Sequence, residues 1–342
     1  MQKIRRAEKS GPVSRWWSRL ASSALPTVGC EIAHTGISLA RWSQNSTRLE
    51  TAAWKPISAG ALEASPLREN IQKPEEVRAA FAEALSSLGM SSTPDSSRRL
   101  TDAVLVIPDQ SARLFVLNFD TFPQKASEGL PLVKWRLKKS VPFDIESAAI
   151  SYFVHRSEAE LQVVAAATPL WVIRQYETLA ESFGLRPRRV TLSTLGALGL
   201  AKALEANSPL DAQTGEQGRQ AGVLVAKYSP PWFTTAILQG GTLRLFRTVG
   251  LSTDADGLLS PAEVLSATYP SIAYFQDNFQ GPLTRGYLCG LGQNSASISE
   301  ALERDLNLRA SPLVSDPGVL VAGIDPHQSE RHFAALLGLL RE

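Results

Sequence analysis

The sequence is poor in the side chains that most often bind metals or form disulfide bonds. Its 342 residues include only two cysteines, Cys30 and Cys289, and four histidines. None of these has the C-x-x-C or H-x-x-x-H spacing of a metal site, so a metal centre has no support. The cysteines lie far apart inside apolar runs, which predicts two buried thiols in a reducing compartment rather than a disulfide.

A strong net charge and a long hydrophobic run are missing as well. The 35 Lys+Arg and 33 Asp+Glu leave a net charge of +2, too little for a global field that would attract nucleic acid. No apolar stretch reaches the roughly 18 to 20 residues that span a bilayer. The basic N-terminus lacks the apolar core of a secretory signal. We therefore predict a cytoplasmic protein that binds no nucleic acid.

Residues 1–26 form a basic N-terminal segment that is predicted to be flexible. Arg15, Trp16, Trp17 and Arg19 stand close together in it. Indole rings prefer the headgroup layer of a membrane and arginines prefer anionic lipid, so these four residues are candidates for a peripheral contact with a membrane surface. The alternative is a tail whose tryptophans dock on the protein's own surface, and the short apolar set favours it.

Two halves of the chain repeat one order of elements. Each half opens with three predicted strands and continues with a helix, a strand and a helix. This is the arrangement of two ribonuclease-H-like lobes, and duplication of that unit builds the actin-like fold. We predict an α/β protein of this class. Its predicted parts are the first lobe at 27–112 and 168–205, a linker at 206–221, and the second lobe at 222–342.

A block at 113–167 interrupts the first lobe and is predicted to form a small inserted α+β subdomain. Arg113–Phe119 reads as a strand, Gly129–Lys139 as a helix, and two paired strands follow. The return to the first lobe is predicted to begin with a helix that has Thr168 as its N-cap. Near the C-terminus, a last strand is expected at Val319–Ala322, before a terminal helix.

Short motifs spread along the chain resemble one known family. They are Val104–Pro108, Phe119–Pro123, Lys134–Phe143, Tyr152–Val154, Gln162–Ala167, Gly184–Pro187, Thr191–Ala197 and the closing Leu337–Glu342. Each is short, but their order and spacing together resemble PilM, the actin-like cytoplasmic component of type IV pilus assembly systems. The resemblance covers nearly the whole chain after residue 25.

The resemblance implies a role in assembly. PilM-like proteins lie at the cytoplasmic face of the inner membrane and connect it to the pilus motor ATPases. They bind the short cytoplasmic N-terminal peptide of PilN, a single-pass membrane protein, in a groove between the first lobe and the inserted subdomain. Here Arg113–Val154 would line that groove, with Trp135, Val141 and Phe143 as candidate apolar contacts. Alternatively these three are core residues of the subdomain, because buried and groove-lining side chains look alike in sequence.

The two loops that hold phosphate in an actin-like ATPase are altered in this chain. Each loop needs small residues and an acid. In the first, Glu31 stands where the family has Asp, and Ala33 where it has Gly. The second, Ala226–Trp232, has no acid and two prolines, which donate no N–H. The family's adenosine turn is reduced to Gly290-Leu291-Gly292.

We therefore predict a non-catalytic protein with no bound cofactor. Glu31, Gly290 and Gly292 would be vestiges of a nucleotide site, although the glycines are equally those of a plain turn. Several alternatives remain: an actin-like protein that still binds ATP, a working ATPase or sugar kinase, and a related tether. The second loop argues against the ATPase and the kinase. A secretion-platform protein would continue into a transmembrane helix after Glu342, and an FtsA-like cell-division tether would end in a basic amphipathic helix.

Overall fold

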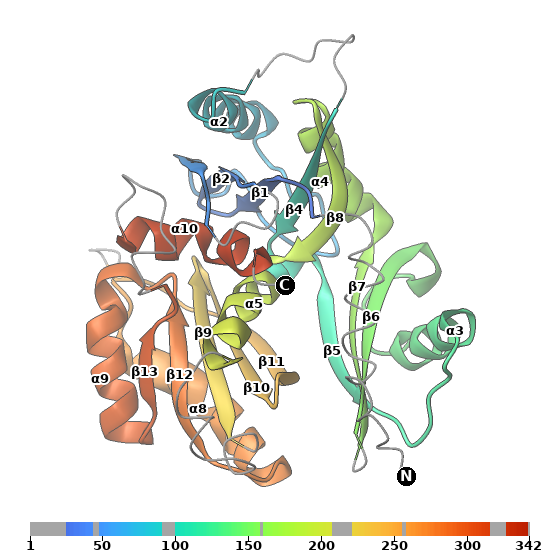
Figure 1. Ribbon diagram of the computed structural model, residues 1–342, viewed down its shortest axis with the longest axis vertical. Coiled ribbons are helices and arrows are strands. Elements are labelled where there is room, and N and C mark those ends of the chain that lie inside the picture. The colour runs from blue at the N-terminus through green and yellow to red at the C-terminus, as the bar shows by residue number, and fades with distance from the viewer. Residues whose placement is uncertain are drawn as a thin grey trace, which may run out of the picture.

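The computed structural model describes residues 25–43, 48–90, 100–157, 160–206, 221–254, 258–314 and 326–340, with the backbone alone at 284 and 326–330. These residues form two lobes of similar architecture and a smaller inserted subdomain (Figure 1). Each part has its own sheet. Among the described residues, no helix is both long and apolar enough to cross a bilayer.

The first lobe is built on a five-stranded sheet with the order β3-β2-β1-β4-β8. β1, β2 and β3 form an antiparallel meander, whereas β4 and β8 run parallel to β1. The bounds of the elements of this lobe are β1 Val28–Ala33, β2 Gly36–Arg41, β3 Thr51–Pro56, α2 Pro74–Ser87, β4 Thr101–Ile107, the 3-10 turn η1 Asp109–Ser111, α4 Leu170–Glu181, β8 Leu185–Leu192 and α5 Ser193–Ala206.

The second lobe repeats this topology with the sheet order β11-β10-β9-β12-β13. The first three strands are again antiparallel, and the last two are again parallel to the first. The bounds are β9 Gly222–Ser229, β10 Trp232–Gln239, β11 Thr242–Gly250, α8 Pro261–Asn278, β12 Leu283–Cys289, the 3-10 turn η3 Gly292–Asn294, α9 Ser295–Leu306, β13 Arg309–Pro312 and α10 Pro326–Leu339.

The inserted subdomain has a three-stranded antiparallel sheet in the order β5-β7-β6, with a helix on one face. The bounds are β5 Arg113–Asn118, α3 Ala126–Leu137, the 3-10 turn η2 Ile145–Ser147, β6 Ala148–Arg156 and β7 Leu161–Pro169. Val133 and Leu137 of α3 are fully buried against the inward face of β7, which contributes Val163, Ala165 and Ala167. The subdomain therefore has a small core of its own.

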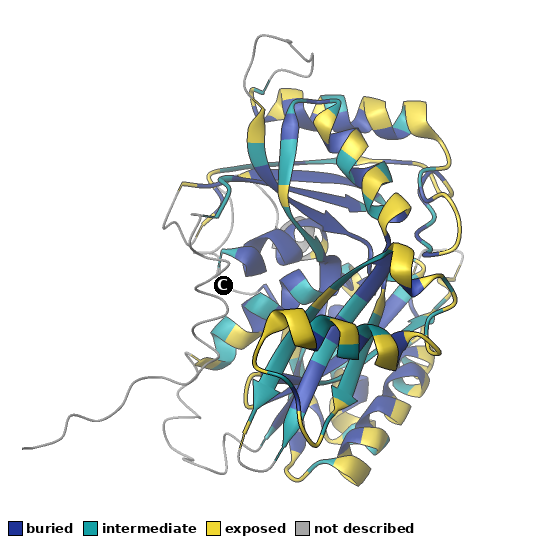
Figure 2. Cartoon of the chain, turned by 90° about the vertical axis from the view of Figure 1, so that its right-hand side faces the viewer, coloured by how far each residue is buried: buried dark blue, intermediate teal, exposed yellow. Residues whose placement is uncertain are grey.

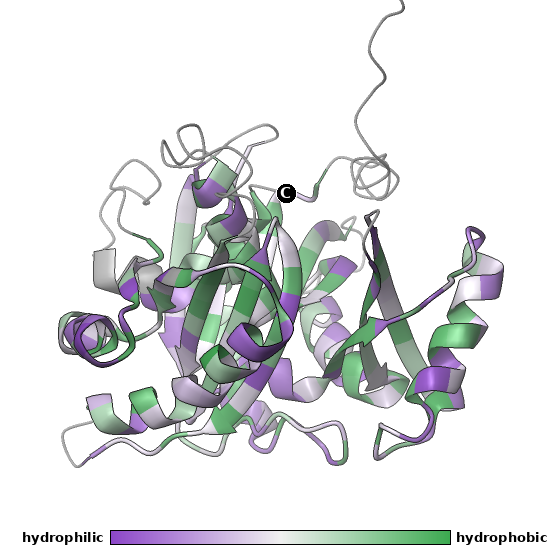
Figure 3. Ribbon diagram, turned by 90° about the horizontal axis from the view of Figure 1, so that it is seen from below, coloured by the Kyte–Doolittle hydropathy of each residue, from purple (hydrophilic) through white to green (hydrophobic). Residues whose placement is uncertain are grey.

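The lobe sheets are buried on both faces because helices cover each of them. α2 and α4 pack on the outer face of the first sheet, and α8 and α9 on that of the second, while α5 and α10 lie between the lobes (Figures 1 and 2). Strands in such sheets are apolar on both sides. Figure 3 shows hydrophobic residues concentrated in the strands, whereas the outer helices also present hydrophilic faces.

The two inner helices, α5 and α10, cross at a pair of glycines. A Cβ atom on Gly338 would overlap with the carbonyl oxygen of Gly196, and one on Gly196 would lie 2.8 Å from the carbonyl oxygen of Ala335. Backbone therefore meets backbone at the centre of the molecule. The flanking residues Ala335, Leu336 and Leu337 are buried in the apolar cluster that joins the lobes.

Some details of the fold differ from the prediction. β7 continues through Pro169, so Thr168 is a strand residue and not the N-cap of α4; its Oγ1 donates instead to the Ser111 carbonyl at 2.6 Å. α3 begins at Ala126, earlier than predicted, and contains Pro131. The strand expected at Val319–Ala322 lies outside the described residues. The fifth strand of the second lobe is β13, whose exposed and half-buried side chains carry no strand signal.

Candidate functional site

The cleft between the lobes is where an actin-like protein would hold a nucleotide. It lies between the β1–β2 turn and the β9–β10 turn, and residues of α10 close one side of it. The space left there is about 20 Å³, enough for about one water molecule. Pockets for drug-sized ligands have about 300 to 1,000 Å³. The protein's own side chains therefore fill this cleft.

Two charged side chains of opposite sign are buried in the cleft, one from each lobe. Glu31 of β1 and Lys227 of β9 are each 6% exposed. Glu31 accepts a hydrogen bond from Ser193 at the start of α5, and the Lys227 ammonium donates to Ser229 at 2.6 Å. Burial raises the pKa of Glu31, while the charge of Lys227 and the Ser193 hydrogen bond act to lower it. Lys227 thus supplies a positive charge to a carboxylate that would otherwise be buried without one.

A second buried acid, Asp109, joins the lobes through hydroxyl groups. It follows β4 in η1 and accepts hydrogen bonds from the Thr194 backbone N–H, at 2.9 Å, and from the Thr194 hydroxyl. Thr234 of the second lobe donates to it at 3.4 Å and contacts Thr248 at 2.9 Å. Since Thr194 lies in the first turn of α5, the helix N-terminus favours this negative charge.

Sequence reasoning identified Glu31 but missed Asp109, Ser193 and Lys227 as its neighbours. One local signal was available: Ser193-Thr194 stands before an apolar run, as at a helix N-terminus. The approach of Asp109 to that helix could not be read from the sequence, because the two segments are 85 residues apart.

Two histidines complete the cleft. His332 of α10 is buried and stacks on Trp54 of β3, with ring centroids 3.9 Å apart and planes at 20°. Burial, with the nearby charges of Arg331 and Lys227, lowers the pKa of His332 to about 3. Burial and Lys227 lower the pKa of His34 to about 4. Both rings are therefore neutral at physiological pH.

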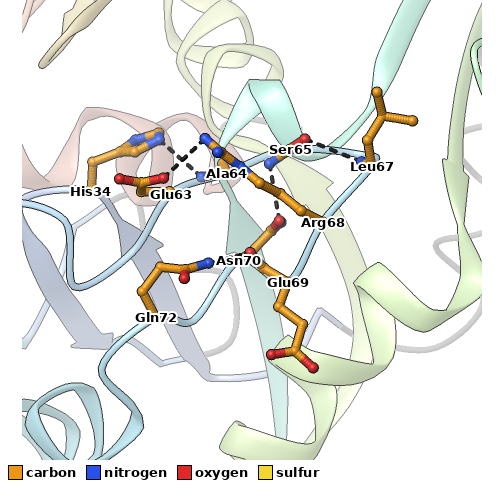
Figure 4. A network of polar contacts seen from close by, with 9 residues as sticks. All are labelled: His34, Glu63, Ala64, Ser65, Leu67, Arg68, Glu69, Asn70 and Gln72. Carbon is orange, nitrogen blue, oxygen red and sulfur yellow. Dashed lines mark hydrogen bonds and ion pairs between the residues drawn. The ribbon is translucent and has the colours of Figure 1, made fainter.

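The loop that contacts His34 also reaches the base of the inserted subdomain. The backbone N–H of Ala64 approaches His34 Nε2 at 3.4 Å, and Asn70 closes the same loop by accepting from the Ser65 N–H at 3.0 Å (Figure 4). Asn70 is fully buried and donates to Tyr176 of α4 at 3.0 Å and to Ser111 at 3.2 Å. The Tyr176 and Ser111 hydroxyls are 2.9 Å apart. The Asn70–Ser111–Tyr176 hub therefore lies where the chain enters and leaves the subdomain.

The structure separates the three predicted vestiges of the nucleotide site. Glu31 lines the cleft, and Gly292 does not. Gly290 does not line it either; its φ is +77°, and a Cβ there would overlap with the carbonyl oxygen of Tyr228. A close approach between β9 and the turn after β12 thus accounts for Gly290 without a ligand.

A larger hollow of about 600 Å³ lies on the inserted subdomain. This groove is formed by α3, the loop after β5 and the start of β7, and it lies at the end of β5 remote from the first lobe (Figure 1). Phe119, Leu132 and Leu161 are half-buried at its floor, and Trp135, at 70% exposed, stands on its wall. Here apolar surface is open to solvent.

The candidate contacts Trp135, Val141 and Phe143 do not form one surface. Trp135 lines the groove, whereas Val141 and Phe143 are half-buried and pack against the small core of the subdomain. The hollow of about 600 Å³ lies on the subdomain itself and is distinct from the groove predicted between the subdomain and the first lobe, which stays a prediction. The candidates for membrane contact, Arg15, Trp16, Trp17 and Arg19, lie outside the described residues.

The subdomain is also tied to the second lobe beside the groove. Glu160, on the groove wall, forms an ion pair with Arg244 of β11, whose guanidinium lies 5.2 Å from the ring centroid of Phe279. His155 Nδ1 and the Thr242 hydroxyl are 3.1 Å apart in the same interface. The subdomain is thus held against the second lobe beside the groove.

Comparison with known proteins identifies the fold. No protein-family model matches the sequence, and no curated protein matches it. Among solved structures, a chain of the PilM-PilN type IV pilus biogenesis complex has a TM-score of 0.69 at 18% identity, covering 93% of this chain and 98% of that chain. That likeness gives the present chain a PilM-like version of the actin-like fold, as predicted.

Two further structures are more distant. An actin-like ATPase-fold protein of unknown function from Bacteroides thetaiotaomicron has a TM-score of 0.48 at 9% identity, covering 94% of this chain and 97% of that chain. The cytoplasmic domain of EpsL, an inner membrane component of the type II secretion system of Vibrio cholerae, has a TM-score of 0.45 at 12% identity, covering 92% of this chain and 94% of that chain.

Proposed function

We propose that this chain is a non-catalytic scaffold of the type IV pilus assembly platform at the cytoplasmic face of the inner membrane. In this role it binds the cytoplasmic N-terminal peptide of a PilN-like single-pass membrane protein and links that protein to the pilus motor. The peptide binds on the inserted subdomain, and Trp135 is its candidate apolar contact.

The observation that carries this proposal is the contrast between the two hollows. The interlobe cleft has about 20 Å³ and is closed by the protein's own side chains, whereas the subdomain groove has about 600 Å³ and an exposed tryptophan, Trp135. A large aromatic side chain that nothing in the described part of the molecule covers is typical of a protein contact site. The likeness in fold to a chain solved with PilN supports the choice of partner.

Filling of the cleft by opposite charges supports a role without catalysis. An actin-like ATPase places acids where Mg²⁺ and the attacking water bind. Here Lys227 brings a positive charge into the cleft, where it acts to lower the pKa of Glu31. The residues present therefore do not fit a Mg²⁺–nucleotide complex, and no reaction step is assigned to them.

Peptide titration tests the proposal. A fluorescently labelled peptide with the cytoplasmic N-terminal residues of the PilN-like protein encoded in the same genome is titrated with the full chain, and anisotropy is recorded. We expect saturable binding. Trp135→Ala weakens it about 30-fold, because truncating a central interface tryptophan costs about 2 kcal/mol.

Trp171→Ala is the matched control. Trp171 is an exposed tryptophan of α4, 43% exposed, and does not line the groove. It should leave affinity unchanged. If the peptide does not bind, or if both variants bind as the wild type does, the groove has no such role.

Calorimetry tests the absence of a nucleotide function separately. Titration of the full chain with ATP and Mg²⁺ is expected to release no heat of binding, and no phosphate should be produced. A micromolar dissociation constant for ATP would overturn this part of the proposal and leave the peptide groove unaffected.

A further inference from the structure

The outer face of α3 points away from the two lobes. Val133 and Leu137 of this helix are buried on one face of the subdomain sheet, in its small core. Val164 of β7 lies on the opposite face of that sheet and packs in the cluster that joins the lobes. The sheet therefore stands between α3 and the interlobe cluster, and α3 lies at the outside of the molecule (Figure 1). Its outer face is open to a large partner.

Trp135 lies on this outer face. It is two residues from both Val133 and Leu137, and a step of two residues turns an α-helix by more than half a circle, to the side opposite the buried one. Trp135 is 70% exposed, more than any other large apolar side chain in the described part of the chain. An indole ring has an apolar body and a polar N–H, which suits a protein interface or the headgroup layer of a membrane.

The charges beside Trp135 favour the membrane. Residues 134–143 include several bases and no acid. Arg136, Lys138 and Lys139 are exposed, and none of them forms an ion pair within the residues that the structure describes. The charge of Lys138 acts to lower the pKa of Asp144, but it is the weakest of the causes that do so. Basic residues at the end of a helix also stabilise its dipole, yet that role requires no exposed tryptophan.

The acids near this surface do not cancel its charge. Glu128, the acid of α3, is paired with Lys125 at 3.6 Å. In the hollow beside Trp135, Glu160 is paired with Arg244, which leaves Asp120 as the acid of that lining. The end of α3 therefore keeps an excess of positive charge next to its exposed indole ring.

We infer that the end of α3 contacts the surface of an anionic bilayer. Trp135 enters the headgroup layer, and Arg136, Lys138 and Lys139 lie against the lipid phosphates. This contact goes beyond the proposed function and does not depend on it. A peptide that covers Trp135 would exclude lipid from the same side chain, so the peptide contact and the lipid contact belong to different states of the protein.

The expected strength is that of a reversible contact. Each Lys or Arg close to an anionic surface strengthens binding by about fivefold, so three of them together contribute about 100-fold. Salt screens this attraction, because the charges are exposed and the Debye length is about 8 Å at physiological ionic strength. One indole ring and three bases do not anchor a protein permanently, and the chain would exchange between the membrane surface and solution.

Sedimentation with vesicles tests the inference. The full chain, without any peptide, is mixed with vesicles of phosphatidylcholine and phosphatidylglycerol, or of phosphatidylcholine alone. We expect binding to the anionic vesicles only. Lys138→Gln/Lys139→Gln should weaken it by about 25-fold, because two bases are lost. Trp135→Ala should weaken it as well but leave its salt dependence unchanged, because that variant loses no charge.

Lys202→Gln/Arg309→Gln is the matched control. Both residues are exposed bases that lie outside the inserted subdomain, on α5 and β13, so the same loss of net charge should leave vesicle binding unchanged. If the wild type does not bind anionic vesicles, or if Lys138→Gln/Lys139→Gln binds them as the wild type does, the inference is wrong. The peptide titration contains no lipid, so its outcome is independent of this one.

Discussion

Lys227 and Glu31 both line the interlobe cleft, each from the first strand of its lobe. Both are buried, and the positive charge of Lys227 lowers the pKa of a carboxyl group that burial raises. In the sequence, Lys227 is only one residue of a loop, Ala226–Trp232, that lacks the acid of an actin-like ATPase. In the structure, its charge acts to lower the pKa of Glu31, whereas the second buried acid, Asp109, acts to raise it.

A double-mutant cycle should measure this interaction. Lys227→Met should lower the free energy of unfolding by about 3 kcal/mol, because it leaves Glu31 buried without its counter-charge. In a Glu31→Gln background the same change should cost less, which gives a coupling of at least about 1 kcal/mol by urea unfolding. The coupling should be larger at pH 8 than at pH 5, because Lys227 favours the ionised carboxylate.

Lys202→Met is the control for this cycle. Lys202 is an exposed lysine of α5, and its loss should cost less than about 0.5 kcal/mol. Equal losses from Lys227→Met in the wild-type and Glu31→Gln backgrounds would show that the two residues act independently.

His332, one of the two neutral histidines of the cleft, should make stability fall in acid. The pKa of His332 is about 3 in the folded state, against 6.5 for a free histidine, so below about pH 6.5 the unfolded chain binds a proton that the folded chain does not. His332→Phe keeps the stack on Trp54 and removes the titration. The stability of the wild type relative to this variant should fall by about 1.4 kcal/mol per pH unit as the pH falls from about 6.5 to about 4.

Urea unfolding at several pH values would record this difference. Comparison with the variant isolates His332, because both proteins contain the other titrating groups of the cleft: His34, which also destabilises in acid, and Glu31, whose raised pKa makes stability fall as the pH rises. A constant difference between the two proteins would mean that His332 is protonated equally in the folded and unfolded states.

The glycine crossing should tolerate no side chain. Gly338→Ala would place a methyl group on the Gly196 carbonyl oxygen. Either α5 and α10 would then move apart, or their backbones would be distorted. We expect a loss of about 3 kcal/mol or more in the free energy of unfolding. Gly250→Ala is the control, because its Cβ would lie 3.8 Å from Trp232 at an ordinary contact distance. Similar melting temperatures for the two variants would contradict the tight crossing.

The hub at the base of the subdomain should be sensitive to one hydroxyl group. Burial raises the pKa of Tyr176 to about 12, and its hydroxyl is hydrogen-bonded to Asn70 and Ser111. Tyr176→Phe leaves those buried partners without it and should cost about 1 to 3 kcal/mol. Hydrogen exchange should also show faster opening of residues 63–72 than in the wild type. Unchanged exchange in that loop would show that the hub does not order it.

Much of the fold could be predicted from the sequence because its signals are local. The meander strands, the helix start at Pro74 and the repeat of the pattern after residue 222 depend on nearby residues. β13 was not predicted, because a short edge strand with exposed side chains lacks the alternation of apolar and polar residues that marks a strand. Thr168 was misassigned because a Thr-Pro pair also suits the end of a strand.

The candidate sites were harder to predict because they depend on distant contacts. Trp135, Val141 and Phe143 have similar apolar character in the sequence, yet only Trp135 lines the groove. Which face of α3 is covered depends on β7 and on the loop at Phe119, and no local pattern encodes that. The counter-charge role of Lys227 likewise appears only when β9 is placed beside β1.

The contact between Gly196 and Gly338 has a mechanical consequence. Packed protein interiors are hardly compressible, and at this crossing no side chain stands between the backbones that could change its rotamer under load. The two helices therefore cannot be pressed closer together at this point, and neither can shift sideways past the other unless the backbones first move apart.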